Sequence, residues 1–340
     1  MAVSSWSTAR LAAETVVVPV EETDVGAAAG EVSQGAGGVI LFGTSAPTDL
    51  GTALGSLERS VPGRHGLLVM TDEEGGGIQR MANLVGSLPW PKEMAATLTP
   101  AEITSVVSAV ARKMSGYGVN MDLAPVVDVD GRDVLPGPSD PDGLRSFSGS
   151  TSVVTTDGMA FARGLEQGGV IPVLKHFPGL GGASGNTDVE AAHTLAWSTL
   201  EQVALPPFVA GIAAGVPAIM VSNATVPGLT SLPASLSSAA IEKELVGALH
   251  FHGLVVTDSL SAAAISAAGY SVPAAAVAAL RAGADMTMYT GSSGGPSVSS
   301  LFSEIVATIV RAVRRHSLGR GRLVAAATAV LAVRHVRVCP

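Results

Sequence analysis

The stretch that decides the fold is "VIPVLKHFPGLGGASGNTD", residues 170–188. It begins with an apolar run, Val170 to Leu174, that has no polar face, and such runs are typical of strands buried on both sides of a parallel sheet. The run ends in Lys175 and His176 and then passes into a loop that contains four glycines. A buried strand that ends in two titratable side chains predicts a site at that end of the strand.

Seven further apolar runs share this character and lie at 16–20, 37–43, 66–72, 120–129, 217–223, 253–259 and 284–290. Between them are segments with apolar residues at helical spacing, such as 101–118 and 237–253. Eight alternating units predict an α/β fold, a (β/α)8 TIM-type barrel that forms one domain over residues 1–340. An open doubly wound sheet is the alternative, but no GxGxxG follows an early strand.

The bulk composition excludes several classes of protein. The net charge of −8 and the lack of a basic stripe argue against a nucleic-acid partner. Because no stretch of about 18 uninterrupted apolar residues occurs, we expect no membrane partner. The single cysteine, Cys339, cannot form an internal disulfide or a cysteine metal site. With no signal-peptide pattern at the N-terminus, we expect a cytoplasmic protein, as a monomer or weak homodimer.

Polar residues end five of the eight predicted strands. They are Asp72, Glu73 and Glu74; Asp128 and Asp130; Lys175 and His176; Ser222 and Asn223; and Asp258 and Ser259. In a barrel these strand ends meet at one mouth, where the active site is built. Asp258 alone could simply cap the helix that follows it. Five strands that end in this way are better explained by a shared pocket.

The pocket predicted in this way is rich in carboxylates. Acidic groups with interspersed donors suit sugar hydroxyls, and a pair of carboxyl groups that flank a bond is the usual apparatus of glycoside cleavage. Schiff-base chemistry by Lys175 is a competing interpretation. The "DEE" cluster at 72–74 could hold a divalent metal, but no HxH or HExxH spacing accompanies it. We therefore expect no metal and no cofactor.

Several longer motifs occur in a familiar order. They are "TDEEGGGIQRM" (71–81), "GLRSFSGS" (143–150), "KHFPGLG" (175–181) and "PASLSSAAIEKELVGALHFHGLVVTDSLSAAAI" (233–265). In these motifs the chain resembles glycoside hydrolase family 3, specifically its single-domain β-N-acetylhexosaminidase branch. The resemblance runs from about residue 37 to about residue 288. It implies a barrel fold and a retaining mechanism through a covalent glycosyl-enzyme.

The resemblance also implies roles for individual residues. Asp258 occupies the position of the nucleophile, and Asp72 that of the carboxylate that accepts hydrogen bonds from the outer hydroxyls of the sugar. The donors that hold the ring are expected to be Arg80, Arg145, Lys175 and His176. Three structural alternatives stay open, because Arg80 could instead pair with Glu74, His176 could be a satisfied core histidine, and Asp128 could only fix a loop.

The sequence departs from the family in the loop after "KHFPG". Usual members carry Asp-Ser-His there, whereas this chain carries Asn186, Thr187 and Asp188. We therefore predict that Asp188 is the general acid and base, with Glu190 or His193 as alternatives. The glycines before Asp188 are expected to let the loop swing.

The predicted function is a retaining exo-β-N-acetylglucosaminidase that removes terminal β-linked GlcNAc from a carbohydrate substrate. A β-glucosidase or a metabolite-specific glycosidase of the same family is one alternative. A member that binds sugar without cleaving it is another, since the acid/base loop is altered.

Overall fold

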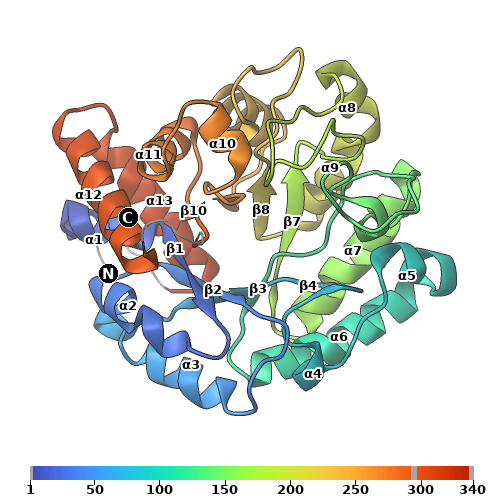
Figure 1. Ribbon diagram of the computed structural model, residues 1–340, viewed down its shortest axis with the longest axis horizontal. Coiled ribbons are helices and arrows are strands. Elements are labelled where there is room, and N and C mark those ends of the chain that lie inside the picture. The colour runs from blue at the N-terminus through green and yellow to red at the C-terminus, as the bar shows by residue number, and fades with distance from the viewer. Residues whose placement is uncertain (1–2, 292–296, 337–340) are drawn as a thin grey trace.

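Eight parallel strands form the central sheet, and helices surround it (Figure 1). The computed structural model describes residues 3–291 and 297–336. The strands, in their order around the sheet, are β10 (Thr287–Met288), β1 (Val16–Glu21), β2 (Gly38–Phe42), β3 (Leu68–Thr71), β6 (Met121–Asp122), β7 (Ile171–Phe177), β8 (Ala218–Val221) and β9 (Leu254–Thr257). A parallel bridge between Val256 and Met286 joins the two ends of this order. The sheet is thereby a TIM-type barrel, which confirms the predicted fold class.

Each strand overlaps one of the eight apolar runs of the sequence, and the open-sheet alternative is wrong. The run at 120–129 differs most, because only Met121 and Asp122 form a regular strand. Pro125 has no amide hydrogen and cannot donate to a ladder. The chain nevertheless continues beside β7, where Val126 forms a bridge with Lys175.

The helices cover the outside of the barrel (Figure 1). They are α1 (Thr8–Glu14), α2 (Ala29–Gln34), α3 (Leu50–Glu58), α4 (Ala82–Val85), α5 (Pro91–Thr97), α6 (Pro100–Gly116), α7 (Thr151–Gln167), α8 (Trp197–Val203), α9 (Leu205–Ala214), the π-helix η6 (Ala239–Ala248), α10 (Ala263–Ala267), α11 (Val272–Ala282), α12 (Val298–Arg314) and α13 (Arg320–Val333). The segment 101–118 became α6, which starts with Pro100 in its first turn and a capping box of Thr99 and Glu102. The segment 237–253 became η6.

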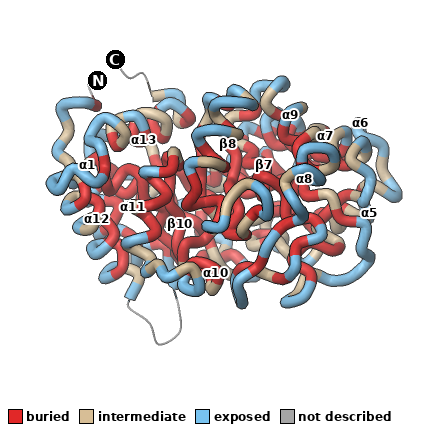
Figure 2. The backbone as a smooth tube through the Cα atoms, turned by 90° about the horizontal axis from the view of Figure 1, so that it is seen from above, coloured by how far each residue is buried: buried red, intermediate tan, exposed pale blue. Residues whose placement is uncertain are grey.

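The hydrophobic core has two main layers. Figure 2 shows that the buried residues gather in the interior of the molecule. Inside the barrel lie residues that alternate along the strands, such as Leu68 and Met70 of β3. Val69 between them faces outward and packs in the layer beneath the helices. Successive strand residues point to opposite faces, so one apolar run supplies both layers.

The amino-terminal end of the barrel is closed by α13, whose Val330 and Val333 belong to the inner layer of the core. Just beyond α13, the guanidinium of Arg334 lies 2.6 Å from the buried carboxylate of Glu14 and donates to the carbonyl of Gly66. This leaves the opposite end, where the strands terminate, for the functional site.

Within the described residues, every helix is too short or too polar to cross a membrane. Cys339 lies outside the described residues.

Candidate active site

A cavity of about 540 Å³ opens at the carboxyl ends of the strands. Its lining includes all seven residues that the sequence predicted for the site: Asp72, Arg80, Arg145, Lys175, His176, Asp188 and Asp258. They come from segments spread over almost 190 positions of the chain, and only the barrel topology brings them together.

The best-connected group in the cavity wall is Glu74, which is only 2% exposed. It accepts two hydrogen bonds from Arg145, at 2.7 and 2.8 Å, and lies 2.5 Å from the ammonium of Lys175. Burial alone would raise the pKa of Glu74, but Arg145 and Lys175 outweigh burial and lower the pKa well below its usual range. Glu74 is therefore an anion that holds two cations in place.

Asp72 lies beside this group and joins it through Lys175, whose ammonium is 2.9 Å from the Asp72 carboxylate. Arg80 lies 3.6 Å from Asp72, so the alternative in which Arg80 pairs with Glu74 is wrong. Burial alone would lower the pKa of Lys175, but Asp72 and Glu74 raise it above its usual value. A Lys175 amine kept protonated in this way is a poor nucleophile, which counts against the Schiff-base interpretation.

Arg80 is presented by a short antiparallel pair, β4 (Glu73–Gly75) and β5 (Ile78–Gln79), that follows β3. The carboxylate of Glu73 accepts the backbone N–H of Arg80 at 2.7 Å and the side-chain amide of Gln79 at 2.9 Å. Burial raises the pKa of Glu73 to about 7. Glu73 thus fixes the turn that aims Arg80 at the cavity.

At the end of β7, the side chains of both Lys175 and His176 line the cavity. Neighbouring strand residues normally point to opposite faces, but the register of β7 against β8 shifts between Leu174 and Phe177. The imidazole Nδ1 of His176 lies 2.7 Å from the Asp128 carboxylate, which also accepts the N–H of Leu180 at 2.6 Å. Asp128 therefore fixes the loop, as one sequence interpretation held, and orients His176 as well.

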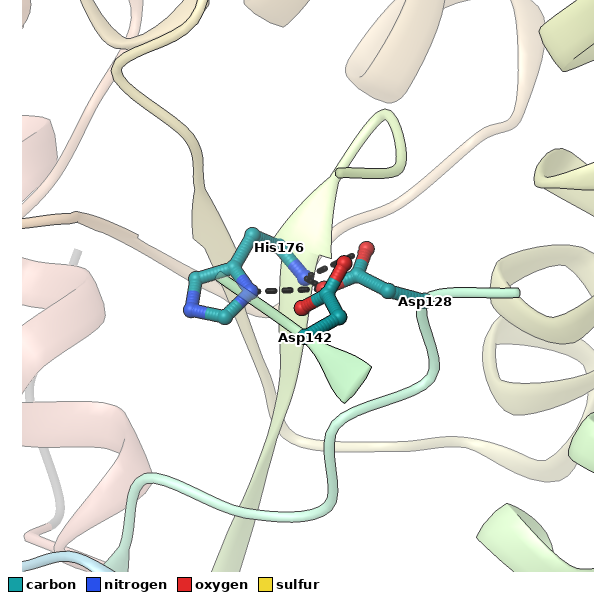
Figure 3. A group of neighbouring side chains, drawn as sticks. All are labelled: Asp128, Asp142 and His176. Atoms are coloured by element: carbon teal, nitrogen blue, oxygen red, sulfur yellow. Dashed lines mark hydrogen bonds and ion pairs between the residues drawn. The ribbon is translucent and has the colours of Figure 1, made fainter. Parts of the chain in front are cut away.

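Asp142 is a buried carboxylate that sequence reasoning missed. Figure 3 shows it beside Asp128 and His176, and potential ligand atoms of the three residues all lie within 4.8 Å of one another. These three residues could hold a metal ion. The turn-like "DPDG" sequence around Asp142 gave no signal, because nothing in it indicates which strand end the loop covers.

Asp258 follows β9 directly and is half-buried in the cavity wall. Its carboxylate accepts the N–H of Ser259 at 2.6 Å. The helix-cap interpretation of Asp258 is wrong, because α10 begins only at Ala263. The first-turn N–H groups of α10 at Ala263 and Ala264 donate instead to the backbone carbonyls of Asp188 and Thr187.

Asp188 lines the cavity at its rim, where the residue is exposed to solvent. Burial, and next the negative charge of Asp258, raise the pKa of its carboxyl group. The alternatives Glu190 and His193 are exposed and do not belong to the cavity lining among the described residues.

The glycines of this loop have a packing function. A Cβ on Gly181 would lie 2.1 Å from the carbonyl oxygen of Val129, so no side chain fits there. The loop is also tied down, because the N–H of Asn186 donates to the carbonyl of Pro138. Close packing is therefore enough to explain the glycines. A swinging loop, which the sequence suggested, is not needed to explain them.

Comparisons with known proteins agree on one family. Residues 27–333 match the family model described as the glycosyl hydrolase family 3 N-terminal domain. The chain is 36% identical over 270 residues to the β-hexosaminidase LpqI of Mycobacterium tuberculosis, an alignment that covers 77% of this chain and 68% of that protein.

Solved structures are similar over nearly the whole length. A glycosyl hydrolase of family GH3 from Mycobacterium smegmatis superposes with a TM-score of 0.86 at 33% identity and covers 98% of both chains. A β-N-acetylhexosaminidase from Beutenbergia cavernae has a TM-score of 0.87 at 28% identity, over 98% of this chain and 100% of its own.

The network around Glu74 generates a stability prediction. We expect Glu74→Gln to lower the free energy of unfolding by about 3–5 kcal/mol at pH 7, because it leaves two buried cations without their shared anion. The pKa of Glu74 is lowered by folding, so its contribution is complete above its unfolded pKa of about 4.3 and is lost as pH falls below it. Urea unfolding at pH 7, 4 and 3 measures the difference.

The matched control is Glu58→Gln, the same change at an exposed position of α3, which should alter stability by less than about 0.5 kcal/mol. Equal effects of the two substitutions, or a Glu74→Gln difference that stays constant at low pH, would contradict this account of the network.

Proposed function

The chain belongs to glycosyl hydrolase family 3 and is a glycoside hydrolase, and from this premise we propose that it is a retaining exo-β-N-acetylglucosaminidase. The observation that carries the proposal is the position of Asp258, which lines the same cavity as the Glu74 network and Asp72. Named relatives of the chain are β-hexosaminidases, which supports GlcNAc as the sugar.

The cavity suits one terminal sugar. Its floor includes Ile40, Leu123, Met220 and Met288, which belong to the inner barrel core or pack against it. A sugar chain cannot pass through such a floor, so only an end residue can enter, which supports exo cleavage. Asp72 offers carboxylate oxygens to hydroxyl groups, and Arg80 lies next to it as a donor.

In the first step we assign nucleophilic attack to Asp258. A carboxylate oxygen forms a bond to C1 of the sugar while the bond from C1 to the leaving oxygen breaks, and Asp188 gives its proton to that oxygen. In the second step Asp188 takes a proton from water, the water oxygen bonds to C1, and the bond to Asp258 breaks. The sugar leaves with retained configuration.

The surroundings of Asp188 act in the direction that these steps need. Burial first, and next the charge of Asp258, raise the pKa of Asp188 in the free enzyme, which favours the protonated form of the acid. Once Asp258 is esterified to the sugar its charge is gone, so the pKa of Asp188 falls. The same group then serves as the base for water.

Substrate choice and the nucleophile are tested together. We expect turnover of aryl β-GlcNAc to exceed turnover of aryl β-glucoside, and Asp258→Asn to reduce kcat by more than about 1,000-fold, because the attacking carboxylate is lost. A 2-fluoro sugar should label the wild-type protein once, on the peptide that contains Asp258, as read by mass spectrometry.

The control is Asp49→Asn, the same change at an exposed site, which should keep full activity. Hydrolysis that persists in Asp258→Asn, with no label on Asp258 in the wild type, would point to attack by the N-acetyl group and overturn this assignment. A higher turnover of the aryl β-glucoside would overturn the assignment of GlcNAc as the substrate sugar.

The acid role of Asp188 has its own signature. Asp188→Ala should slow substrates with poor leaving groups by about 10²–10⁴-fold and activated aryl glycosides far less, because only the former need the proton. Asp188→His should move the alkaline limb of kcat/KM to higher pH, since imidazole has an ordinary pKa of about 6.5 against about 3.9 for Asp. The shift is toward higher pH because a general acid loses its proton, and with it its activity, as pH rises through its pKa. Equal losses on both substrates would rule out the role.

A further inference from the structure

The carboxyl group of Asp142 is an anomaly of the fold. The residue is 0% exposed, and among the described residues neither of its carboxylate oxygens has a hydrogen-bond partner. Buried polar groups are nearly always satisfied, and a bare buried carboxylate costs several kcal/mol. A carboxyl group in this position needs either a cation beside it or a proton on it.

The neighbours of Asp142 indicate a metal ion. The Asp142 carboxylate lies beside the Asp128 carboxylate and the imidazole of His176 (Figure 3). Each of the three residues offers one potential ligand atom, and these three atoms all lie within 4.8 Å of one another. A metal ion that holds each ligand at about 2.0–2.5 Å brings neighbouring ligand atoms to separations of roughly 3–4.5 Å. It would therefore replace the hydrogen bond that joins Nδ1 of His176 to Asp128 at 2.7 Å and move these two atoms slightly apart.

The surrounding charges leave this group short of cations. Arg145, the nearest arginine in sequence, donates hydrogen bonds to Glu74 at 2.7 and 2.8 Å and to the carbonyl of Pro141 at 2.8 Å, so only its charge acts on Asp142. Arg132 is occupied by Asp130 and Asp140, at 3.3 and 2.7 Å. Two fully buried carboxylates, Asp128 and Asp142, therefore lie side by side with His176 next to them (Figure 3).

We propose that Asp128, Asp142 and His176 bind one divalent cation of the zinc type. Two carboxylates and one imidazole form a ligand set that suits Zn²⁺, with a further position open to water. The ligands come from three separate segments, which is why the sequence, with no local His spacing, led us to expect no metal.

Such an ion would act on the sugar site through His176. Bound at Nδ1, it would leave Nε2 as the nitrogen that carries the proton and faces the cavity that His176 lines. The imidazole would then be a fixed donor toward a sugar hydroxyl. In this arrangement Asp142 is a positioning residue that does not itself contact the substrate.

The test uses metal content and thermal unfolding, so its outcome is independent of any glycosidase assay. The full chain is stripped with EDTA, dialysed and titrated with Zn²⁺. We expect one Zn²⁺ per chain after gel filtration and a rise in Tm of about 5 °C at a hundredfold excess over Kd. Asp142→Asn should lose both effects.

The matched control is Asp133→Asn, the same change at an exposed position of the loop that follows Asp130, which should keep both effects. The proposal is overturned if the wild type binds no Zn²⁺. It is also overturned if Asp142→Asn binds as much Zn²⁺ as the wild type, because the ions would then lie only on the surface. Should Asp142→Asn fail to fold, His176→Gln is measured in its place and decides by the same two readouts.

Discussion

The cavity depends on the buried ion pairs that Glu74 makes with Arg145 and Lys175. The three groups come from β4, from the segment before α7 and from β7, so their mutual neutralisation fixes three parts of the barrel mouth relative to one another. Each of these charges would be costly alone in the interior, and together they are tolerated only in this geometry. Asp72 shares Lys175 with Glu74 and is therefore held in a defined position at the cavity surface.

A second constraint directly joins the segments that carry Asp258 and Asp188, the proposed nucleophile and acid. The carbonyls of Thr187 and Asp188 accept the first N–H groups of α10, five residues after Asp258. These hydrogen bonds satisfy donors that the start of a helix would otherwise leave free. They also place the Asp188 loop over the strand end that carries Asp258, whose charge contributes to the raised pKa of Asp188.

Much of this arrangement could be predicted from the sequence. The apolar runs required a parallel sheet with both faces covered, and barrel topology then brought Asp72, Lys175 and Asp258 to one mouth without knowledge of any loop. The alternative that Arg80 pairs with Glu74 was wrong, because Arg145 and Lys175 from distant segments occupy Glu74 and Arg80 lies beside Asp72. Asp142 could not be found at all, because its burial depends on how the 131–142 loop folds back over β7. The positions of side chains at strand ends can be predicted from the topology, whereas the positions of side chains on loops depend on tertiary packing.

The central claim is that a single terminal GlcNAc sits over Asp258 with its outer hydroxyls on Asp72. A crystal structure of the protein with GlcNAc bound tests this most directly. The account predicts C1 about 3–3.5 Å from a carboxylate oxygen of Asp258 and a hydroxyl group within hydrogen-bond distance of Asp72. A sugar bound elsewhere, or bound in this cavity with C1 turned away from Asp258, would contradict it.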